Sequence, residues 1–128
     1  MKVVDASVIV KLFIEEAGSD AAIKLTNDED LVVPNLLYIE VGNTLATKAQ
    51  LSLSQVEEGL DLIYGLGLRV ENVDRELLTA ASTMAKQMGT SVYDMVYAAL
   101  ARRLGVELVT ADKKFVSKTK FDFVKLLS

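Results

Sequence analysis

Short apolar runs alternate with stretches of helical periodicity along the chain, and this alternation limits the possible fold more than any other feature. Strands that are separated by helices usually pair in parallel, because the chain crosses back over the sheet between them. We therefore predict an α/β fold in three layers, with a central parallel sheet of four to five strands and helices on both faces. The runs that we interpret as strands cover residues 2–5, 31–33, 68–73, 107–110 and 123–126, the last at an edge.

Capping residues and glycines indicate where the intervening helices begin and end. Gly89 and Gly105 each follow a periodic stretch and are typical of helix ends, and Pro34 should stop the second strand. The expected helices cover about residues 7–16, 19–27, 35–50, 54–65, 74–88, 91–104 and 113–117, with Ser19, Asn35, Asp74 and Ser91 as caps and a capping box at residues 54–57.

The composition is that of a globular chain. Its 128 residues correspond to about one domain, which we expect to cover residues 1–128. The longest apolar run, residues 95–101, is far shorter than the roughly 20 residues of a membrane span. No signal-peptide pattern opens the chain, and the absence of cysteine fits a reducing compartment. We therefore expect a cytoplasmic protein without a membrane partner.

Histidine and cysteine are both absent. Their absence excludes Ser-His-Asp and Cys-His triads, histidine-based ribonuclease chemistry, phosphohistidine relays, disulfides and Cys/His zinc sites. Catalysis by this chain has to use carboxylates, hydroxyl groups, lysine or arginine, or a hard metal ion that is bound by oxygen.

The charge is unevenly distributed. Residues 102–128 carry seven basic and three acidic side chains, whereas residues 1–101 carry seven basic and fifteen acidic ones. A basic C-terminal segment on an acidic body is compatible with a nucleic-acid partner, and equally with an ordinary solvated surface.

Four acidic residues stand in apolar surroundings: Asp5, Glu40, Asp94 and Asp112. Asp5 ends a predicted strand and Asp112 comes just after another, Glu40 lies early in a helix after a strand, and Asp94 opens a helix that leads back to the next strand. The predicted topology places all four at the rim that is formed by the carboxyl ends of the strands, where α/β proteins bind ligands. Carboxylates that share one edge repel one another, and Mg²⁺ or Mn²⁺ would neutralise them.

Three of these acids have a structural alternative. Asp5 could cap the helix that follows it, although Ser7 is an equally good cap. Asp94 is the third residue after Ser91 and could be its capping-box partner, and Asp112 could cap a short helix. These alternatives stay open at this point.

Glu40 is harder to explain by structure alone. It shares a helix face with Asn43, Thr44 and Thr47, at spacings of three, four and seven residues. This polar face could simply be exposed to solvent, or it could extend a polar site from Glu40 to Asn43.

These motifs resemble those of the PIN-domain nucleases, and their order and spacing resemble those of the VapC toxins of VapBC toxin–antitoxin pairs. The resemblance covers nearly the whole chain. The motifs are Asp5-Ala6-Ser7-Val8 after a strand, Glu40 early in the third helix, Asp94 before Ala98-Ala99-Leu100-Ala101, and Thr110-Ala111-Asp112 with Phe115.

The resemblance implies a three-layer PIN-like fold and a ribonuclease that depends on Mg²⁺ or Mn²⁺. Asp5, Glu40, Asp94 and Asp112 match the acidic quartet of the family, as catalytic and metal-binding residues. Ser7 and Thr110 match its small polar partners, and Asn43 is a weaker match. Some members carry a further acid after the last one, where this chain has Lys113 and Lys114, and this difference puts a tightly held second metal in doubt.

The implied reaction is metal-assisted hydrolysis, in which an activated water attacks in line and leaves a 3′-hydroxyl and a 5′-phosphate. Lys11, Arg102, Lys113 and Lys114 would then contact the RNA backbone and make binding sensitive to salt. The family also implies a homodimer and a VapB-like antitoxin, and the hydrophobic content of 51% supports apolar surface for a partner.

Two other functions fit parts of the pattern. A PIN-like scaffold could bind RNA or protein without cutting it, although such a scaffold has no need for four clustered acids. An aspartyl-phosphate receiver or phosphatase also uses an aspartate at a strand end. A phosphatase of the haloacid type would have a second aspartate at the position of Ser7. A receiver would have paired acids after the first strand and a lysine after the last. Neither pattern is present.

Overall fold

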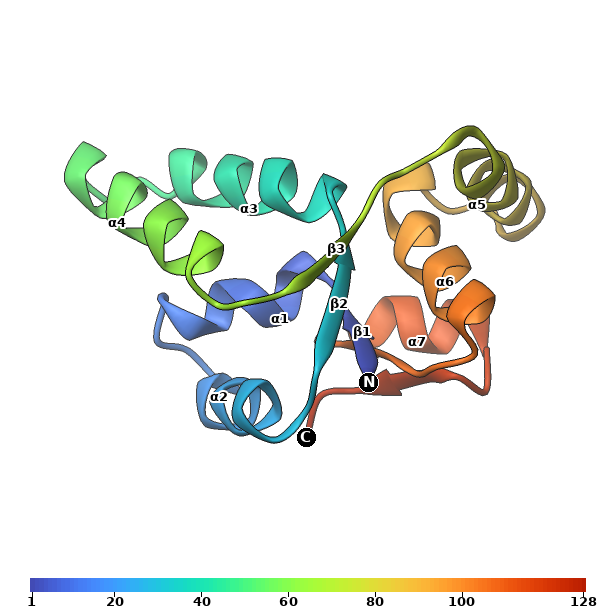
Figure 1. Ribbon diagram of the computed structural model, residues 1–128, viewed down its shortest axis with the longest axis horizontal. Coiled ribbons are helices and arrows are strands. Elements are labelled where there is room, and N and C mark those ends of the chain that lie inside the picture. The colour runs from blue at the N-terminus through green and yellow to red at the C-terminus, as the bar shows by residue number, and fades with distance from the viewer.

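A computed structural model describes residues 1–128 and contains one parallel sheet of five strands (Figure 1). The order across the sheet is β3-β2-β1-β4-β5, so β1 and β4 are neighbours although most of the chain lies between them. The predicted parallel sheet is confirmed, with the last strand at an edge. The strands are β1 (Lys2–Val4), β2 (Leu31–Pro34), β3 (Arg69–Glu71), β4 (Leu108–Thr110) and β5 (Val124–Leu126).

Helices cover both faces of the sheet. Figure 1 shows α1 to α4 on one side and α5 to α7 on the other, which gives the three predicted layers. None of these helices is both long enough and apolar enough to cross a membrane. The helices are α1 (Ala6–Ile9), followed by a 3₁₀ turn η1 (Val10–Leu12), α2 (Ser19–Asp28), α3 (Leu36–Thr47), α4 (Leu53–Tyr64), α5 (Arg75–Met88), α6 (Val92–Leu104) and α7 (Lys113–Thr119).

Helix α6 is the most deeply buried helix, and it contacts β1, β2 and β4. Every residue from 95 to 101 is buried, including three alanines, whose small side chains allow the helix to lie close to the sheet. As α6 runs back toward the start of β4, its first turn has to begin at the rim. This packing is what brings Asp94 to the carboxyl ends of the strands.

The predicted caps of α5 and α6, which depend on residues close in sequence, are confirmed. The side chain of Asp74 accepts a hydrogen bond from Leu77 N at 2.7 Å, and α5 ends at Gly89 with a φ of 65°. The side chain of Ser91 accepts one from Asp94 N at 3.2 Å, and α6 ends at Gly105 with a φ of 68°. Both glycines adopt the left-handed conformation that favours glycine after a helix.

The first expected helix is shorter than its pattern suggests. Helix α1 ends at Ile9, and one 3₁₀ turn continues to Leu12, whereas the prediction reached residue 16. Ser19 explains the difference, because its hydroxyl accepts from Glu16 N at 3.0 Å and donates to Ile14 O at 3.3 Å. It closes the loop between α1 and α2 and does not cap α2, whose N-cap is Gly18.

Further boundaries also differ from the prediction. Asn35 precedes α3 without capping it, and its Oδ1 accepts from Val73 N at 3.3 Å, which ties the ends of β2 and β3 together. The capping box of α4 uses Ser52 and Gln55, two residues before the predicted Ser54. Pro34 is the last residue of β2, and α3 ends at Thr47 rather than near residue 50.

Helices α3 and α4 approach each other closely at Gly59, and this contact makes a testable prediction. A Cβ atom at Gly59 would lie 2.8 Å from Leu45 Cδ1, whereas one at Gly42 would meet its nearest atom, in Leu60, at 3.9 Å. Alanine favours a helix over glycine by about 1 kcal/mol, and overpacking typically costs about 1–3 kcal/mol. Gly59→Ala is therefore expected to be about 1–3 kcal/mol less stable than the matched Gly42→Ala variant in urea unfolding. Equal stability of the two variants would contradict the close packing.

Candidate active site at the carboxyl ends of the strands

Asp5 lies at the centre of the rim because β1 and β4 are adjacent. Val4 pairs with Val109, so the next residues along the two segments, Asp5 after β1 and Thr110 at the end of β4, come together although 105 positions separate them. Ser7 Oγ donates to Asp5 Oδ1 and Thr110 Oγ1 donates to Asp5 Oδ2, both at 2.5 Å. Each carboxylate oxygen of Asp5 thus has one hydroxyl donor.

The two hydroxyl groups are themselves held by the loop after β4. Ala111 N donates to Ser7 Oγ at 3.0 Å, and Asp112 N donates to Thr110 Oγ1 at 3.1 Å. Because each hydroxyl accepts a backbone N–H, its own proton is available for Asp5. Asp5 occupies the N-cap position of α1, but its side chain makes no capping hydrogen bond. No capping hydrogen bond thus supports this alternative for Asp5, although the nearby backbone N–H of Val8 helps to lower the pKa of the carboxyl.

Glu40 reaches the rim from α3 and meets a residue of α6 that the sequence analysis missed. The hydroxyl of Tyr97 donates to Glu40 Oε1 at 2.5 Å. Tyr97 is only 2% exposed, whereas Glu40 is partly buried. The signal that could have identified Tyr97 is its position three residues after Asp94, on the same face of the helix. Asn43 is exposed, so the polar face of α3 is solvated there.

Asp94 and Asp112 lie at helix N-termini. Asp94 donates its backbone N–H to Ser91, and no reciprocal capping-box bond from its side chain exists, so its carboxylate is not needed for capping. Asp112 does cap α7, because its Oδ1 accepts from Lys114 N at 3.0 Å and from Phe115 N at 3.1 Å. The capping alternative for Asp112 is confirmed, and it leaves the second oxygen of this carboxylate free of hydrogen bonds within the protein.

Besides burial, the charge of Asp94 raises the pKa of Asp5 and of Glu40, and the charge of Asp112 raises the pKa of Asp94. Burial raises the pKa of Asp5 to about 6, against the opposing effect of the Ser7 and Thr110 hydroxyls, and the charge of Asp94 adds to the increase. Burial also raises the pKa of Glu40, where Tyr97 opposes the shift and Asp94 adds to it. The pKa of Asp94 is raised by burial, with Ser91 opposing and Asp112 adding. Each acid therefore lies within the field of another.

The donor set fits a hard divalent cation. It consists of carboxylate and hydroxyl oxygens, and none of the seven ion pairs in the protein includes Asp5, Glu40, Asp94 or Asp112. Mg²⁺ is commonly held by only one or two carboxylates. In the present side-chain arrangement no three acids are close enough to ligate one ion together.

The four predicted RNA-binding residues do not lie together. Lys113 and Lys114 are exposed on the first turn of α7, directly after Asp112. Lys11 is bound to Glu16 at 3.1 Å and to Ala17 O at 2.7 Å, and its side chain is only 13% exposed. Arg102 lies in the last turn of α6, at the end of the helix opposite to Asp94. The structure thus keeps only the two adjacent lysines at the rim with free side chains.

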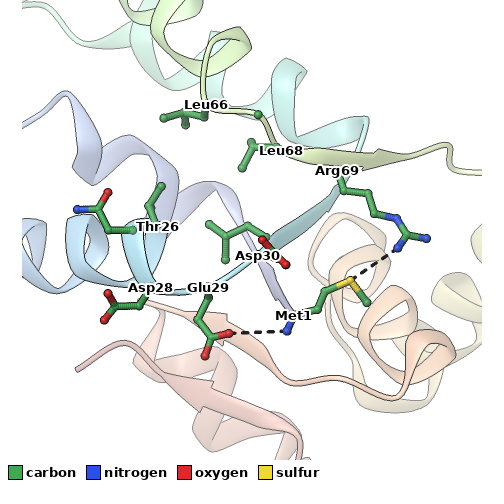
Figure 2. A pocket seen from close by; sticks show the side chains of 11 residues that line it. Met1, Thr26, Asp28, Glu29, Asp30, Leu66, Leu68 and Arg69 are labelled. Carbon is green, nitrogen blue, oxygen red and sulfur yellow. Dashed lines mark hydrogen bonds and ion pairs between the residues drawn. The ribbon is translucent and has the colours of Figure 1, made fainter.

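A pocket of about 400 Å³ lies at the opposite edge of the sheet, where the strands begin (Figure 2). Met1 N pairs there with Glu29 at 3.7 Å, and Arg69 Nη1 lies 3.8 Å from Met1 Sδ. No residue of the rim lines this pocket. It is therefore separate from the acidic site.

Comparison with known proteins identifies the family. The model of the PIN domain matches residues 2–120. Ribonuclease VapC3 of Pyrobaculum aerophilum is 32% identical over 122 residues, which cover 91% of this chain and 92% of that protein. The chain therefore belongs to the PIN-domain family, and the resemblance found in its motifs is confirmed.

Solved structures agree with this family. PAE2754 from Pyrobaculum aerophilum is 27% identical, with a TM-score of 0.74, and the match covers 98% of this chain and 88% of that one. VapC20 from Mycobacterium tuberculosis, described as a toxin that cleaves the sarcin-ricin loop, has a TM-score of 0.75 at 18% identity, over 91% of this chain and 94% of that one. This second likeness concerns the fold alone.

Proposed function

We propose that this protein is a metal-dependent endoribonuclease of the VapC type, the toxin of a toxin–antitoxin pair. One observation carries the proposal: Asp5, Glu40, Asp94 and Asp112 share one rim and one electrostatic field without a basic partner. Negative charge that is concentrated in this way is costly unless a cation neutralises it. The relative with 32% identity is named a ribonuclease, which supports RNA as the substrate.

In this proposal the quartet of Asp5, Asp94, Glu40 and Asp112 would bind Mg²⁺ or Mn²⁺, with only one or two of its carboxylates as direct ligands at a time. The bound ion would stabilise the charge that develops on the phosphodiester oxygens and favour ionisation of the attacking water. Ser7 and Thr110 hold Asp5 in one orientation, because each donates to one of its oxygens. A carboxylate of the quartet takes the proton of the water. Attack in line leaves a 3′-hydroxyl and a 5′-phosphate.

Lys113 and Lys114 are the residues that we propose to contact the RNA backbone. They follow Asp112 directly and are exposed, so phosphates at the acidic rim come within their reach. Their charges also compensate for the repulsion between the acidic rim and the RNA. Binding through phosphates weakens as salt is added, because counterions compete for them.

A VapB-like antitoxin and a second copy of the chain are the protein partners that we propose. A structural neighbour is described as a toxin–antitoxin complex from Klebsiella pneumoniae, with a TM-score of 0.76. Large apolar side chains that are exposed on α3 and α4, among them Ile39, Leu53 and Tyr64, provide surface for such partners. A nuclease that is inhibited by an antitoxin and acts on cellular RNA needs to be in the cytoplasm, and we propose this location for the protein.

The two alternative functions, an aspartyl-phosphate protein and a scaffold without catalytic activity, have less support. An aspartyl-phosphate receiver needs a lysine beside the phosphorylated aspartate, whereas the side-chain donors to Asp5 are the hydroxyls of Ser7 and Thr110. A scaffold that binds RNA without cutting it would not need the partly buried carboxylates of Asp5 and Asp94, which have no basic partner. The cleavage experiment separates this scaffold from the nuclease.

The test is cleavage of a panel of structured RNAs by the purified chain with 5′- and 3′-end labels. We expect cutting with Mg²⁺ or Mn²⁺, none with EDTA, recovery when the metal is restored, and products with 5′-phosphates. Cutting that persists in EDTA would overturn metal dependence. Binding of RNA without cutting across the panel, by a protein that binds Mn²⁺, would favour the scaffold.

A further inference from the structure

Tyr97 carries a polar group into the most buried part of the protein. The residue lies in α6, between Val96 and Ala98, and it is among the largest fully enclosed side chains of the core. A buried tyrosine hydroxyl is costly unless it makes a hydrogen bond, and leucine or phenylalanine would fill the same volume without that cost. Tyr97 satisfies its hydroxyl with a single side chain, Glu40.

The hydroxyl of Tyr97 lies among three acids of the proposed site. It donates to Glu40 Oε1 at 2.5 Å, and the charges of Glu40, Asp5 and Asp94 all contribute to raising the pKa of Tyr97, after burial as the largest cause. A phenol with a raised pKa stays protonated near neutral pH and acts as a donor. The Tyr97 ring is thus buried in the core while its hydroxyl contacts the acidic site at Glu40.

We infer that Tyr97 is a positioning residue that holds the Glu40 carboxylate by Oε1 and leaves Oε2 free to serve a divalent cation. The inference rests on the proposed function, in which Glu40 belongs to the metal-binding quartet. Glu40 differs from Asp5 in having no second donor, since Tyr97 is the only partner of its carboxylate. Without this bond the long glutamate side chain would be free to leave the site for solvent.

The geometry explains why a tyrosine suits this position. Asp94 and Tyr97 are three residues apart on α6, so one helix face presents both a carboxylate and the donor that orients Glu40 from α3. The buried stretch of α6, residues 95–101, lies in the core, and the helix packs against both the sheet and α5, which fixes the position of the tyrosine ring. The rigid core thereby restrains the flexible Glu40 side chain at the rim. Hydrogen-bond donors that orient a metal ligand commonly act in this way.

The test compares Tyr97→Phe with the wild type and with Tyr93→Phe as a matched control. Tyr93 lies on the same helix and is 61% exposed, so removal of its hydroxyl should change nothing. Mn²⁺ affinity is measured by isothermal titration calorimetry, and Tm by circular dichroism in EDTA. We expect Tyr97→Phe to keep its fold in EDTA and to bind Mn²⁺ about 10-fold more weakly, with cleavage reduced at limiting metal and largely restored at saturating metal.

A double-mutant cycle with Glu40→Gln separates positioning from packing. If Tyr97 acts through Glu40, Tyr97→Phe should have no further effect on Mn²⁺ affinity in the Glu40→Gln background. Equal losses in both backgrounds, or an unchanged affinity in Tyr97→Phe while Glu40→Gln binds weakly, would overturn the inference and leave the proposed function standing. Failure of the wild type to bind Mn²⁺ would overturn the metal site, and the inference with it.

Discussion

Replacement of Asp94 by asparagine is expected to reduce metal-dependent RNA cleavage by about 1,000-fold, on the order of the loss of a principal electrostatic group in an active site. Asp94 is the acid whose charge reaches both Asp5 and Glu40, and it lies in the field of Asp112. Asparagine has nearly the same shape but no charge. The change should therefore remove the centre of the quartet and leave its surroundings in place.

The fold of the Asp94→Asn variant should remain intact, because the removed charge repels its neighbours. The backbone N–H of residue 94, which Ser91 accepts, is unaffected by the substitution. Cleavage rates are measured at saturating Mg²⁺, together with Tm. Asp61→Asn is the control, since Asp61 is exposed on α4 and forms no ion pair. Activity of Asp94→Asn at the level of the wild type would contradict its assignment to the site.

The second large effect concerns stability, and it comes from the burial of Asp5. The pKa of Asp5 is about 6 in the folded protein, and its ordinary value is 3.8. The folded state thus prefers the protonated form. The contribution of Asp5 to the free energy of unfolding is greatest below pH 3.8, falls as the pH rises through about 6, and is lowest at neutral pH.

Asp5→Asn is therefore expected to stabilise the metal-free protein at pH 7.5, and this variant should gain little at pH 4. A shift of this size corresponds to an upper bound of about 3 kcal/mol, and we expect about 1–2 kcal/mol because asparagine cannot accept both hydroxyl donors as the carboxylate does. The gain is measured by urea unfolding in EDTA at the two pH values, with Asp61→Asn as the control. An equal loss of stability at both pH values would show that the hydroxyl bonds outweigh the buried charge.

Bound metal should make the wild type more stable than Asp5→Asn at pH 7.5, which is the reverse of their order in EDTA. A cation that binds only the folded state stabilises it by about 2.7 kcal/mol at a concentration 100-fold above its dissociation constant. Wild type should gain this stability when Mn²⁺ is added at pH 7.5, whereas Asp5→Asn should gain little and should not cleave RNA. An Asp5→Asn variant that is stabilised by Mn²⁺ as strongly as the wild type would show that the ion binds elsewhere.

Several features were predictable because they depend on residues that are near one another in sequence. Helices α5 and α6 have Asp74 and Ser91 as N-caps and Gly89 and Gly105 as C-caps, as local capping rules require. The parallel sheet follows from the alternation of apolar runs and helices. Topology then placed Asp5 beside Thr110, since parallel neighbours end at the same edge.

Other features needed the folded chain. Ser19 and Asn35 look like helix caps, yet each binds backbone groups outside the helix that follows it, because the loops around them offer unsatisfied partners. The sequence pattern presents Tyr97 as one more apolar residue of a buried helix. Only folding brings Glu40, 57 positions away, to the hydroxyl of Tyr97.

The sequence by itself determined the class of the fold, the acids at its rim and the exclusion of histidine and cysteine chemistry, since periodicity, capping and composition are local properties. Only the tertiary structure decided which partners those acids have: hydroxyls for Asp5, a buried phenol for Glu40, backbone amides for Asp112. It also separated Arg102 from the rim and kept Lys113 and Lys114 there. The physical reason is that hydrogen bonding, burial and the resulting pKa shifts depend on distances between remote segments, which exist only after the helices have packed on the sheet.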